Sequence, residues 1–447
     1  MMGAFDSFGR LDRRKRQSIP PETAILAMRA GTTTTSFLAF GNGKSYGDTC
    51  HNDGGALVPM RGRRAILDFD PETGILTAEA GATLEELIAH IAPHGYFLPV
   101  TPGTRFVTLG GAIANDVHGK NHHRRGSFGC HVTGFELLRS DGTVHACSKD
   151  ENPELFNATI GGMGLTGIIL TAAIRLMRVG SLDIAETITP FRSLDAYFDM
   201  AEAADAENEY AVAWVDQLAT GKNTGRGVLL TGNHADNGNF AVFPRATKLT
   251  VPFEMPFSML NGLSLRGFNT AYFHAKARKS GAHLSPYGSF FYPLDAVGNW
   301  NRLYGPKGLY QHQSIIPFAA ARKTIPALLA ASRDAGEASF LTVLKRFGAV
   351  PSPGLLSFPR PGYTLTMDFS NRGASTRALL DRLDAMTVAA GGRVNPYKDQ
   401  HMDAETFAAG FPEWEKLEHL RDPKFNSNFW RRTALALSHP MPALAAE

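Results

Sequence analysis

The sequence predicts an α+β protein with more than one domain, and three observations support this class. The chain has 447 residues, 43% hydrophobic and 19% charged, which is a globular composition with enough length for two or three domains. Between about residues 20 and 180, short strand-like runs alternate with short helical runs and many glycines. Beyond residue 180 the amphipathic segments become longer and glycine becomes sparser, which indicates a second architecture.

The first region carries a recognisable signal for each of its elements: apolar β-type runs, a capping box, an Asp-Gly turn and a proline at a helix start. In chain order, these signals predict a strand at 36–40, strands at 66–70 and 74–81, a helix from the capping box at 83–86, a hairpin turning at Asp141-Gly142, a helix that begins at Pro153 and a buried strand within 161–177.

Two segments of the second half are distinctive. Residues 250–260 (TVPFEMPFSML) combine two prolines with aromatic residues and methionines, which favours a mobile apolar loop over a core element. The last fifty residues contain the short motif NPYKDQHM at 395–402, followed by a helical tail that ends in FWRRTALAL.

Charge and cysteine content exclude several classes of protein. Lys and Arg number 45 against 42 Asp and Glu, a net charge of +3 that is too small to indicate nucleic acid as a partner. The basic run at 10–16 predicts a solvated arm, with a contact to anionic lipid or phosphate as the alternative. The three scattered cysteines indicate neither a disulfide framework nor a zinc ribbon, and with no signal peptide or membrane-spanning run we expect a cytoplasmic protein.

The first glycine loop, AFGNGKSYGD at 39–48, matches no catalytic motif completely. It contains the G-x-S-x-G pattern of a nucleophile elbow, but the residues that follow, DTCHNDGG, do not predict the helix that such an elbow needs. The missing helix also counts against a dinucleotide fingerprint, and the lysine is misplaced for a Walker A loop. What remains is a turn of consecutive backbone N–H groups that can bind a phosphate.

The second glycine loop, at 101–131, gathers four histidines and Cys130 around several glycines. A zinc site, ordinary loop histidines and a cofactor-facing loop are the three interpretations. The adjacent lysine and arginines disfavour a dication. The glycines favour the third interpretation, because they let backbone amides approach a large planar or phosphorylated ligand.

Three motifs together resemble the FAD domain of the vanillyl-alcohol oxidase superfamily, the p-cresol methylhydroxylase type: AFGNGKSYGD, TPGTRFVTLGGAIANDVHGKNHHRRGSFG and ATIGGMGLTGII. Within that superfamily the chain is most similar to the decaprenylphosphoryl-β-D-ribose oxidase family, the flavin subunits of an arabinose-forming epimerase. The similarity covers nearly the whole chain and is loose over residues 185–270. It implies an FAD-binding domain at 1–180, an inserted substrate-binding domain of antiparallel sheet and helices at 181–392, and a C-terminal segment at 393–447 that returns to the FAD-binding domain.

The resemblance also implies which residues hold the cofactor. The first loop is expected to cradle the pyrophosphate, and the second to lie along the ribityl chain and the isoalloxazine. Several superfamily members attach FAD through a histidine at the position of Lys44, so we expect non-covalent FAD here. The implied cofactor residues are Gly41, Asn42, Gly43, Lys44, Ser45, Tyr46, Gly47, Asp48, Gly103, Thr108, Gly110, Gly111, Asn115, Val117, His118, Ile169 and Asn395.

The implied reaction is FAD-dependent oxidation of the 2′-hydroxyl of a polyprenyl-phosphoryl-β-D-ribose to the 2′-keto form. A separate NADH-dependent short-chain reductase is the expected partner that completes the epimerisation. The alternatives are an aldonolactone or sugar-alcohol oxidase that uses O₂, and a flavin-binding protein without turnover. No metal is expected. A lipid-linked substrate would suit the apolar loop at 252–260 and a peripheral contact with the inner face of the membrane, although a lid without a lipid role is an alternative for that loop.

Residue by residue, the resemblance places Tyr46, His118 and Lys398 at the chemistry. Lys398 is expected at the reacting hydroxyl, as a hydrogen-bond donor or as a base if burial lowers its pKa. His118 is expected to position flavin or substrate. The substrate-side residues are Tyr304, Gln311, Gln313, Lys345 and Lys398. The chain departs from the mycobacterial members at Thr366, where they carry the cysteine trapped by nitroaromatic inhibitors, and at Thr364, where they carry asparagine.

Overall fold

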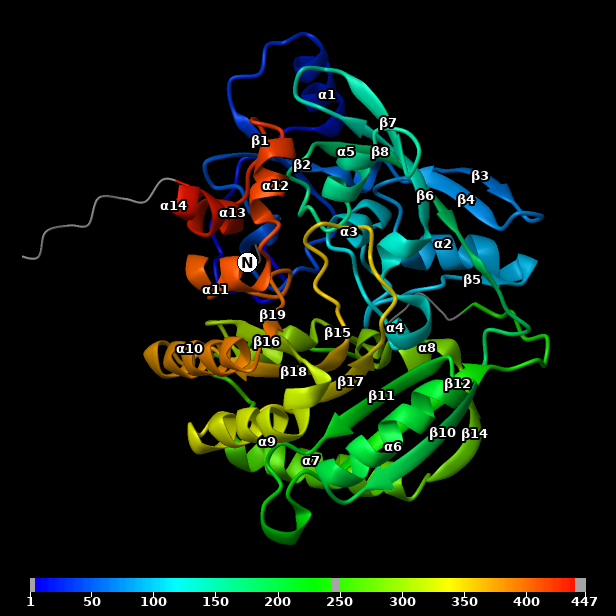
Figure 1. Ribbon diagram of the computed structural model, residues 1–447, viewed down its shortest axis with the longest axis vertical. Helices are drawn as coiled ribbons and strands as arrows, with labels where there is room; N and C mark the ends of the chain where they lie inside the picture. The colour runs from blue at the N-terminus through cyan, green and yellow to red at the C-terminus, as the bar shows by residue number, and fades with distance from the viewer. Residues whose placement is uncertain (1–4, 243–248, 439–447) are drawn as a thin grey trace, which may run out of the picture.

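The computed structural model describes residues 5–242 and 249–438, and these combine helices with largely antiparallel sheets. The α+β class is therefore confirmed. Figure 1 shows two adjoining regions, an upper one that contains the N-terminal strands and a lower one that contains most of the second half of the chain. The C-terminal helices lie beside the N-terminal strands in the upper region, although they are far from them in sequence.

The upper region is built on a five-stranded antiparallel sheet in the order β3-β4-β8-β6-β7. Its strands are β3 (Ile66–Asp70), β4 (Ile75–Glu79), β6 (Val132–Leu138), β7 (Val144–Ser148) and β8 (Ile168–Arg175), and its helices are α2 (Leu84–Ile91), α3 (Leu109–Ala114), α4 (His122–Arg125) and α5 (Pro153–Thr159). Two small sheets accompany it, β1 (Ser36–Phe40) with β2 (Gly55–Pro59) and β5 (Tyr96–Phe97) with β9 (Met177–Arg178), and α1 (Pro21–Arg29) precedes them. The predicted strands, hairpin, helix starts and capping box of this region are confirmed.

The lower region is an eight-stranded sheet in the order β14-β10-β12-β11-β17-β18-β16-β19. Its strands are β10 (Ile184–Phe191), β11 (Tyr210–Val215), β12 (Gly227–His234), β14 (Gly281–Ser285), β16 (Leu309–Ile316), β17 (Val343–Phe347), β18 (Gly362–Ser370) and β19 (Arg393–Val394). Its helices are α6 (Leu194–Glu207), α7 (Gly262–Ala277), α8 (Tyr287–Phe291), α9 (Phe318–Asp334) and α10 (Ala374–Ala389), and a two-stranded sheet pairs β13 (Leu249–Thr250) with β15 (Val297–Gly298).

The two faces of this sheet differ in chemistry because side chains alternate along each strand. On β18, Leu365, Met367 and Phe369 belong to the apolar core formed with α6, α9 and α10. The intervening residues Thr364, Thr366 and Asp368 point to the opposite face, and all three are buried. A polar row is therefore held inside the molecule, on the face away from these helices.

The C-terminal segment closes the upper region with α11 (Ala404–Gly410), α12 (Trp414–Leu420), α13 (Asn428–Arg432) and α14 (Ala434–Ser438). Helix α13 lies against the short 3₁₀ turn Asp48–Cys50 that ends the first glycine loop. The segment begins differently, because β19 pairs with β16 and so extends the eight-stranded sheet. Residues 393–438 thus link both regions.

The basic N-terminal run is not a solvated arm, which corrects the expectation from its charge. Arg10 is buried and pairs with Glu254 of the apolar loop, as does Arg13. The side chain of Arg16 is also buried and pairs with Asp53. The fold brings Glu254 and Asp53 to this run, and the local sequence of the run does not predict these partners.

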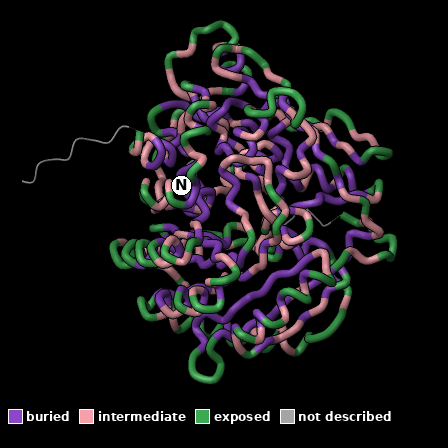
Figure 2. The backbone as a smooth tube through the Cα atoms, in the orientation of Figure 1, coloured by how far each residue is buried: buried purple, intermediate pink, exposed green. Residues whose placement is uncertain are grey.

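Figure 2 shows buried backbone through both sheets and exposed backbone on the outer helices and loops. The apolar loop at 251–260 has no regular structure, and Phe253 and Phe257 are 64% and 61% exposed. Within residues 5–242 and 249–438, no helix combines the length and the apolar character needed to cross a bilayer.

Candidate active site

A cavity of about 600 Å³ lies between the two regions and is lined by residues of both. This volume is within the range of small-molecule and cofactor sites. The structure brings nineteen of the predicted site residues to its wall: Gly41, Asn42, Gly43, Lys44, Ser45, Tyr46, Gly103, Thr108, Gly110, Gly111, Asn115, Val117, His118, Ile169, Gln311, Gln313, Lys345, Asn395 and Lys398.

Three predicted residues, Gly47, Asp48 and Tyr304, do not line the cavity. A Cβ at Gly47 would lie 1.5 Å from the backbone oxygen of Asp399, so this glycine allows the first loop to touch the C-terminal segment. Asp48 is buried and forms an ion pair with Arg432. Tyr304 packs in the aromatic cluster behind Tyr46, and its buried hydroxyl has no hydrogen-bond partner among the described residues. The three residues support the wall from behind.

The two glycine loops are in direct contact at one end of the cavity. A Cβ at Gly41 would lie 2.5 Å from Thr108 Oγ1, so a larger residue would push the loops apart. Asn42 Nδ2 donates to the Phe106 carbonyl at 2.7 Å, which ties the loops together. Gly43 has a φ of +58°, a conformation that glycine adopts without strain. Glycine therefore stands where the first loop packs closely against the second, at Gly41, and where it turns with a positive φ, at Gly43.

The second loop leads into α3, which Thr108 caps by accepting a hydrogen bond from the Gly111 N–H. Asn115 Nδ2 donates to the Gly111 carbonyl at 2.7 Å and closes the turn that leads toward His118. Lys44 Nζ lies 5.6 Å from the ring centroids of both Phe8 and Phe106, and burial lowers its pKa. This end of the cavity therefore offers backbone and one ammonium group.

A chain of hydrogen bonds orients His118 on the wall of the cavity. The Tyr397 N–H donates to Asn395 Oδ1 at 3.0 Å, so Asn395 Nδ2 is the donor to Gln313 Oε1 at 2.8 Å. The amide nitrogen of Gln313 then faces Thr364 Oγ1 and His118 Nε2, each at 3.0 Å. Because that nitrogen carries the hydrogens, His118 Nε2 accepts, and the proton of the neutral ring is on Nδ1.

His118 is therefore a poor proton acceptor. Burial and the neighbouring cations, Lys345 first, lower the pKa of His118 well below its usual value. Its one acceptor nitrogen is already occupied by Gln313. The ring is suited to orient a ligand through its Nδ1–H donor.

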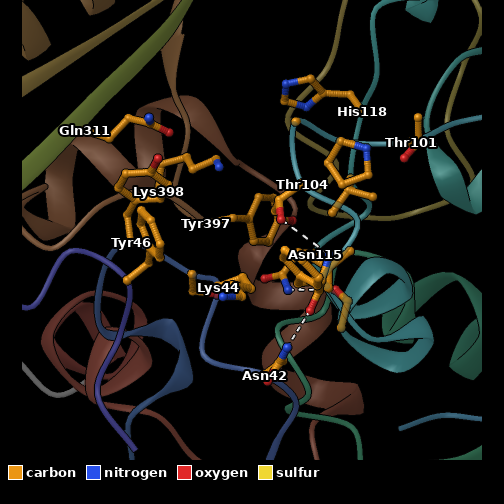
Figure 3. Close-up of a pocket in the computed structure, with 18 of the residues that line it drawn as sticks. Asn42, Lys44, Tyr46, Thr101, Thr104, Asn115, His118, Gln311, Tyr397 and Lys398 are labelled. Carbon is orange, nitrogen blue, oxygen red and sulfur yellow. Dashed lines mark hydrogen bonds between the residues drawn. The ribbon is translucent and has the colours of Figure 1, made fainter. Parts of the chain in front are cut away.

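A second network contains the remaining substrate-side residues. Gln311 Nε2 donates to Asp368 Oδ1 at 2.6 Å, and Gln311 also hydrogen-bonds to the Tyr46 hydroxyl. Lys398 Nζ lies 4.6 Å from the centroid of the Tyr46 ring, and Figure 3 shows Lys398, Tyr46 and Gln311 together on one side of the cavity. Burial lowers the pKa of Lys398 to about 8, with an opposing effect of Asp368, and burial raises the pKa of Asp368 to about 7.

The histidines that suggested a metal site separate in the fold. His122 packs against Phe347 with tilted rings and centroids 4.5 Å apart, whereas His123 and His131 bond to the backbone oxygens of Asn208 and Arg125. In the described part of the chain, no three His, Cys, Asp or Glu side chains come together in a way that could hold a metal ion.

Comparisons with known proteins give the site its chemical context. Residues 22–148 match the FAD binding domain family. The chain is 34% identical over 416 residues to decaprenylphosphoryl-β-D-ribose oxidase of Mycolicibacterium smegmatis, a match that covers 89% of each chain. This chain belongs to the decaprenylphosphoryl-β-D-ribose oxidase family. An uncharacterised Streptomyces coelicolor protein is 35% identical over 378 residues, 79% of this chain and 100% of that one. L-gulonolactone oxidase of Mus musculus is 30% identical over 170 residues, 38% of each chain.

As a member of this family, the protein is an FAD-dependent oxidoreductase, and its cavity fits that cofactor. The glycines at 41, 43, 110 and 111 leave the backbone accessible at one end, as a phosphate-bearing backbone cradle requires. Toward the other end, His118, Gln313 and Lys398 supply the convergent polar groups expected beside a reacting substrate. The first loop would hold the pyrophosphate end, and the second loop the ribityl and ring end.

Lys120, Trp214 and Asp368 are among the residues of the wall or its networks that sequence reasoning missed. Lys120 lies within the quoted second loop, two residues after His118. Asp368 follows Thr364 and Thr366 at alternate positions of β18, between the apolar residues Leu365, Met367 and Phe369, and this alternation is a readable signal. Trp214 lies in the loosely matching segment and had no local signal.

Proposed function

We propose that this enzyme oxidises the 2′-hydroxyl of a polyprenyl-phosphoryl-β-D-ribose, or of a related lipid-linked sugar, to the 2′-keto form. The match over 89% of the chain to an oxidase named for such a substrate supports this proposal. The observation that carries it is the wall of the cavity, which changes from polar to apolar along one row of the eight-stranded sheet.

The row crosses four strands. Gln313 of β16 pairs with Thr366 of β18, Thr366 pairs with Val343 of β17, and Val343 pairs with Trp214 of β11. Neighbouring strands lie about 4.8 Å apart, so the row spans roughly 14 Å. A sugar at its Gln313 end would place an attached apolar chain over Val343 and Trp214.

The apolar wall continues to the surface. The rings of Trp214 and Tyr272 are 4.7 Å apart, and Tyr272 stacks on Phe268 with centroids 6.0 Å apart. Phe268 is 47% exposed, and the nearby Leu263 at the start of α7 is 84% exposed. Aromatic side chains thus lead from the cavity to an exposed apolar surface, as an apolar chain longer than the cavity requires.

The residues of the two networks have different roles in the proposed reaction. When bound, FAD supplies the acceptor for the hydride that leaves the sugar carbon. Lys398 in its neutral form removes the hydroxyl proton, because its pKa of about 8 leaves a useful neutral fraction near pH 7. Asp368 stabilises the resulting ammonium group, and Gln311 holds Asp368 in place. His118 donates to the sugar through Nδ1–H and fixes its orientation.

We also propose a division into domains, non-covalent binding of FAD, a membrane contact and a partner enzyme. Residues 1–180 with the C-terminal segment would form the FAD-binding domain, and residues 181–392 the substrate-binding domain. FAD would be held without a covalent bond, because a lysine occupies position 44. The exposed apolar side chains of Phe253, Phe257 and Leu263 would rest on the inner face of the membrane, where a lipid-linked substrate resides. A separate NADH-dependent short-chain reductase would return hydride to the keto product.

Anaerobic mixing of the holoenzyme with candidate substrates tests the function. We expect the flavin absorbance to bleach with the lipid-linked riboside and to persist with a free aldonolactone. Bleaching by the lactone alone would instead support the soluble sugar oxidase, the class to which the partial match with L-gulonolactone oxidase points. Bleaching by neither compound would leave only a flavin-binding role.

A further inference from the structure

Besides Lys44 of the first glycine loop, three lysines line the same cavity. Lys120 lies in the second glycine loop, Lys345 lies on β17, and Lys398 lies after β19. None of the three forms an ion pair with a carboxylate in the described residues, where Lys416 is the lysine that does so. The cavity therefore holds more positive than negative charge on its wall.

The three charges are compensated unequally. Asp368 favours the charged form of Lys398, and Glu186 favours that of Lys120, although Glu186 already bonds to Ser285 and His283. Lys120 also donates to the Phe290 carbonyl. Lys345 has no such compensation: burial, Lys398 and Lys120 together lower its pKa to about 7.

We propose that Lys345, supported by Lys120, forms an anion subsite that binds the phosphate group of the substrate. This inference rests on the proposed function and adds the group that recognises the charged part of the substrate. An anion between the two ammonium groups would relieve their repulsion and return both to the charged form. Thr364, the partner of Lys345 across the sheet, bonds to Gln313 and so connects this subsite to the sugar end.

The position agrees with the chemistry of a glycosyl phosphate. Its phosphate is joined through one oxygen to the carbon next to the reacting carbon, so the anion must bind within a few bonds of the hydride. Lys345 acts electrostatically on His118 and Lys398, the residues at the reacting hydroxyl. Val343, two residues away on the same face of β17, begins the apolar row. Sugar, phosphate and apolar chain therefore follow one another along the wall.

The test compares a short-chain alkyl-phosphoryl riboside with the alkyl riboside of the same chain length, which lacks the phosphate. In the holoenzyme we expect Lys345→Met to raise the KM of the phosphorylated compound at least 10-fold and that of the neutral compound less than twofold. Lys345→Arg should retain most of the affinity, and Lys120→Met should show the same selectivity with a smaller effect. The exposed Lys323→Met on α9 is the matched control.

A binding measurement separates this inference from the proposed function. Octyl phosphate, titrated into the holoenzyme and followed by the flavin difference spectrum, should bind at least 10-fold more weakly to Lys345→Met than to the wild type. That loss would support the subsite even if no riboside bleached the flavin. Equal losses for the phosphorylated and neutral ribosides, or unchanged octyl phosphate binding in the variant, would overturn the inference.

Discussion

Arg432 of α13 connects the first glycine loop to the segment that carries Lys398, and its removal tests that connection. Its guanidinium donates to both carboxylate oxygens of Asp48, at 2.9 and 3.1 Å, and to Asp399 Oδ2 at 2.9 Å. Asp48 and Asp399 are both buried. Asp48 has no second ion pair within the described residues, so Arg432→Met leaves an unpaired buried carboxylate.

The expected cost follows from that burial. Breaking a buried ion pair costs about 3–5 kcal/mol, and we expect about 3 because the pair is not completely enclosed. The Arg432 side chain is in fact 28% exposed. If the first loop must be reordered when FAD binds, about 3 kcal/mol corresponds to a roughly 100-fold higher Kd for FAD. Equilibrium binding of FAD to the deflavinated protein measures this change directly.

Two controls and the pH dependence sharpen the test. Arg432→Lys should recover part of the affinity, and the exposed Arg382→Met on α10 should change nothing. Burial already raises the pKa of Asp48, and without Arg432 that pKa rises further above its unfolded value. The folded variant then binds more protons than its unfolded chain. Its loss in free energy of unfolding relative to the wild type is therefore smaller at acid pH and larger as the pH rises. A Kd within twofold of the wild type at neutral pH would refute the reasoning.

Acid precipitation should release the flavin into the supernatant, and flavin retained on the polypeptide would contradict non-covalent binding at Lys44. A nitroaromatic inhibitor should leave the mass of the wild type unchanged and add its mass to Thr366→Cys, whose side chain lines the cavity; an adduct at Thr366 in the wild type would be the contrary result. Phe253→Gln with Phe257→Gln should lower activity on a vesicle-borne substrate several-fold and spare a soluble short-chain substrate, whereas unchanged activity on both would exclude a lipid role for the loop. The rate of flavin reduction should rise with pH through about 8 as Lys398 loses its proton, and Lys398→Met should be slow and lack this step; a rate that falls over that range would identify Lys398 as a donor.

Local sequence signals predicted the upper region well because each signal acts over a few residues. Thr83 and Glu86 form the complete capping box that their spacing predicts, and Asp141-Gly142 turns the hairpin between β6 and β7. The prediction of a solvated arm at 10–16 was wrong because the partners of this run are distant in sequence. Arg10 and Glu254 are 244 residues apart, and no local pattern reports a partner at that distance.

The candidate site was predictable where a motif covers it, and less so where it depends on sheet register. Gln313 and Asn395 came from the family resemblance, but the bond that joins them depends on β16 and β19 being neighbours. Asp368 was missed, although it alternates with core residues on β18. In a strand that is buried on both faces, a polar residue at an alternate position needs a partner or a ligand. Trp214 belongs to the same row because β11 pairs with β17, and the local sequence of β11 does not indicate this pairing.

The turn at 395–399 explains why both ends of the cavity depend on one short segment. Asn395 bonds to Gln313 in the network of His118, and Lys398 lines the cavity as the proposed proton acceptor. The Tyr397 hydroxyl lies 2.7 Å from the carbonyl oxygens of both Gly161 and Leu356, to which it has one hydrogen to donate, and Asp399 accepts from Arg432 behind the first loop. Since consecutive residues share one backbone, we expect a displacement of the first loop to be transmitted to Lys398, the proposed proton acceptor. Cofactor binding and proton transfer should therefore weaken together in variants of this turn, whereas variants of Lys345 should affect the substrate alone.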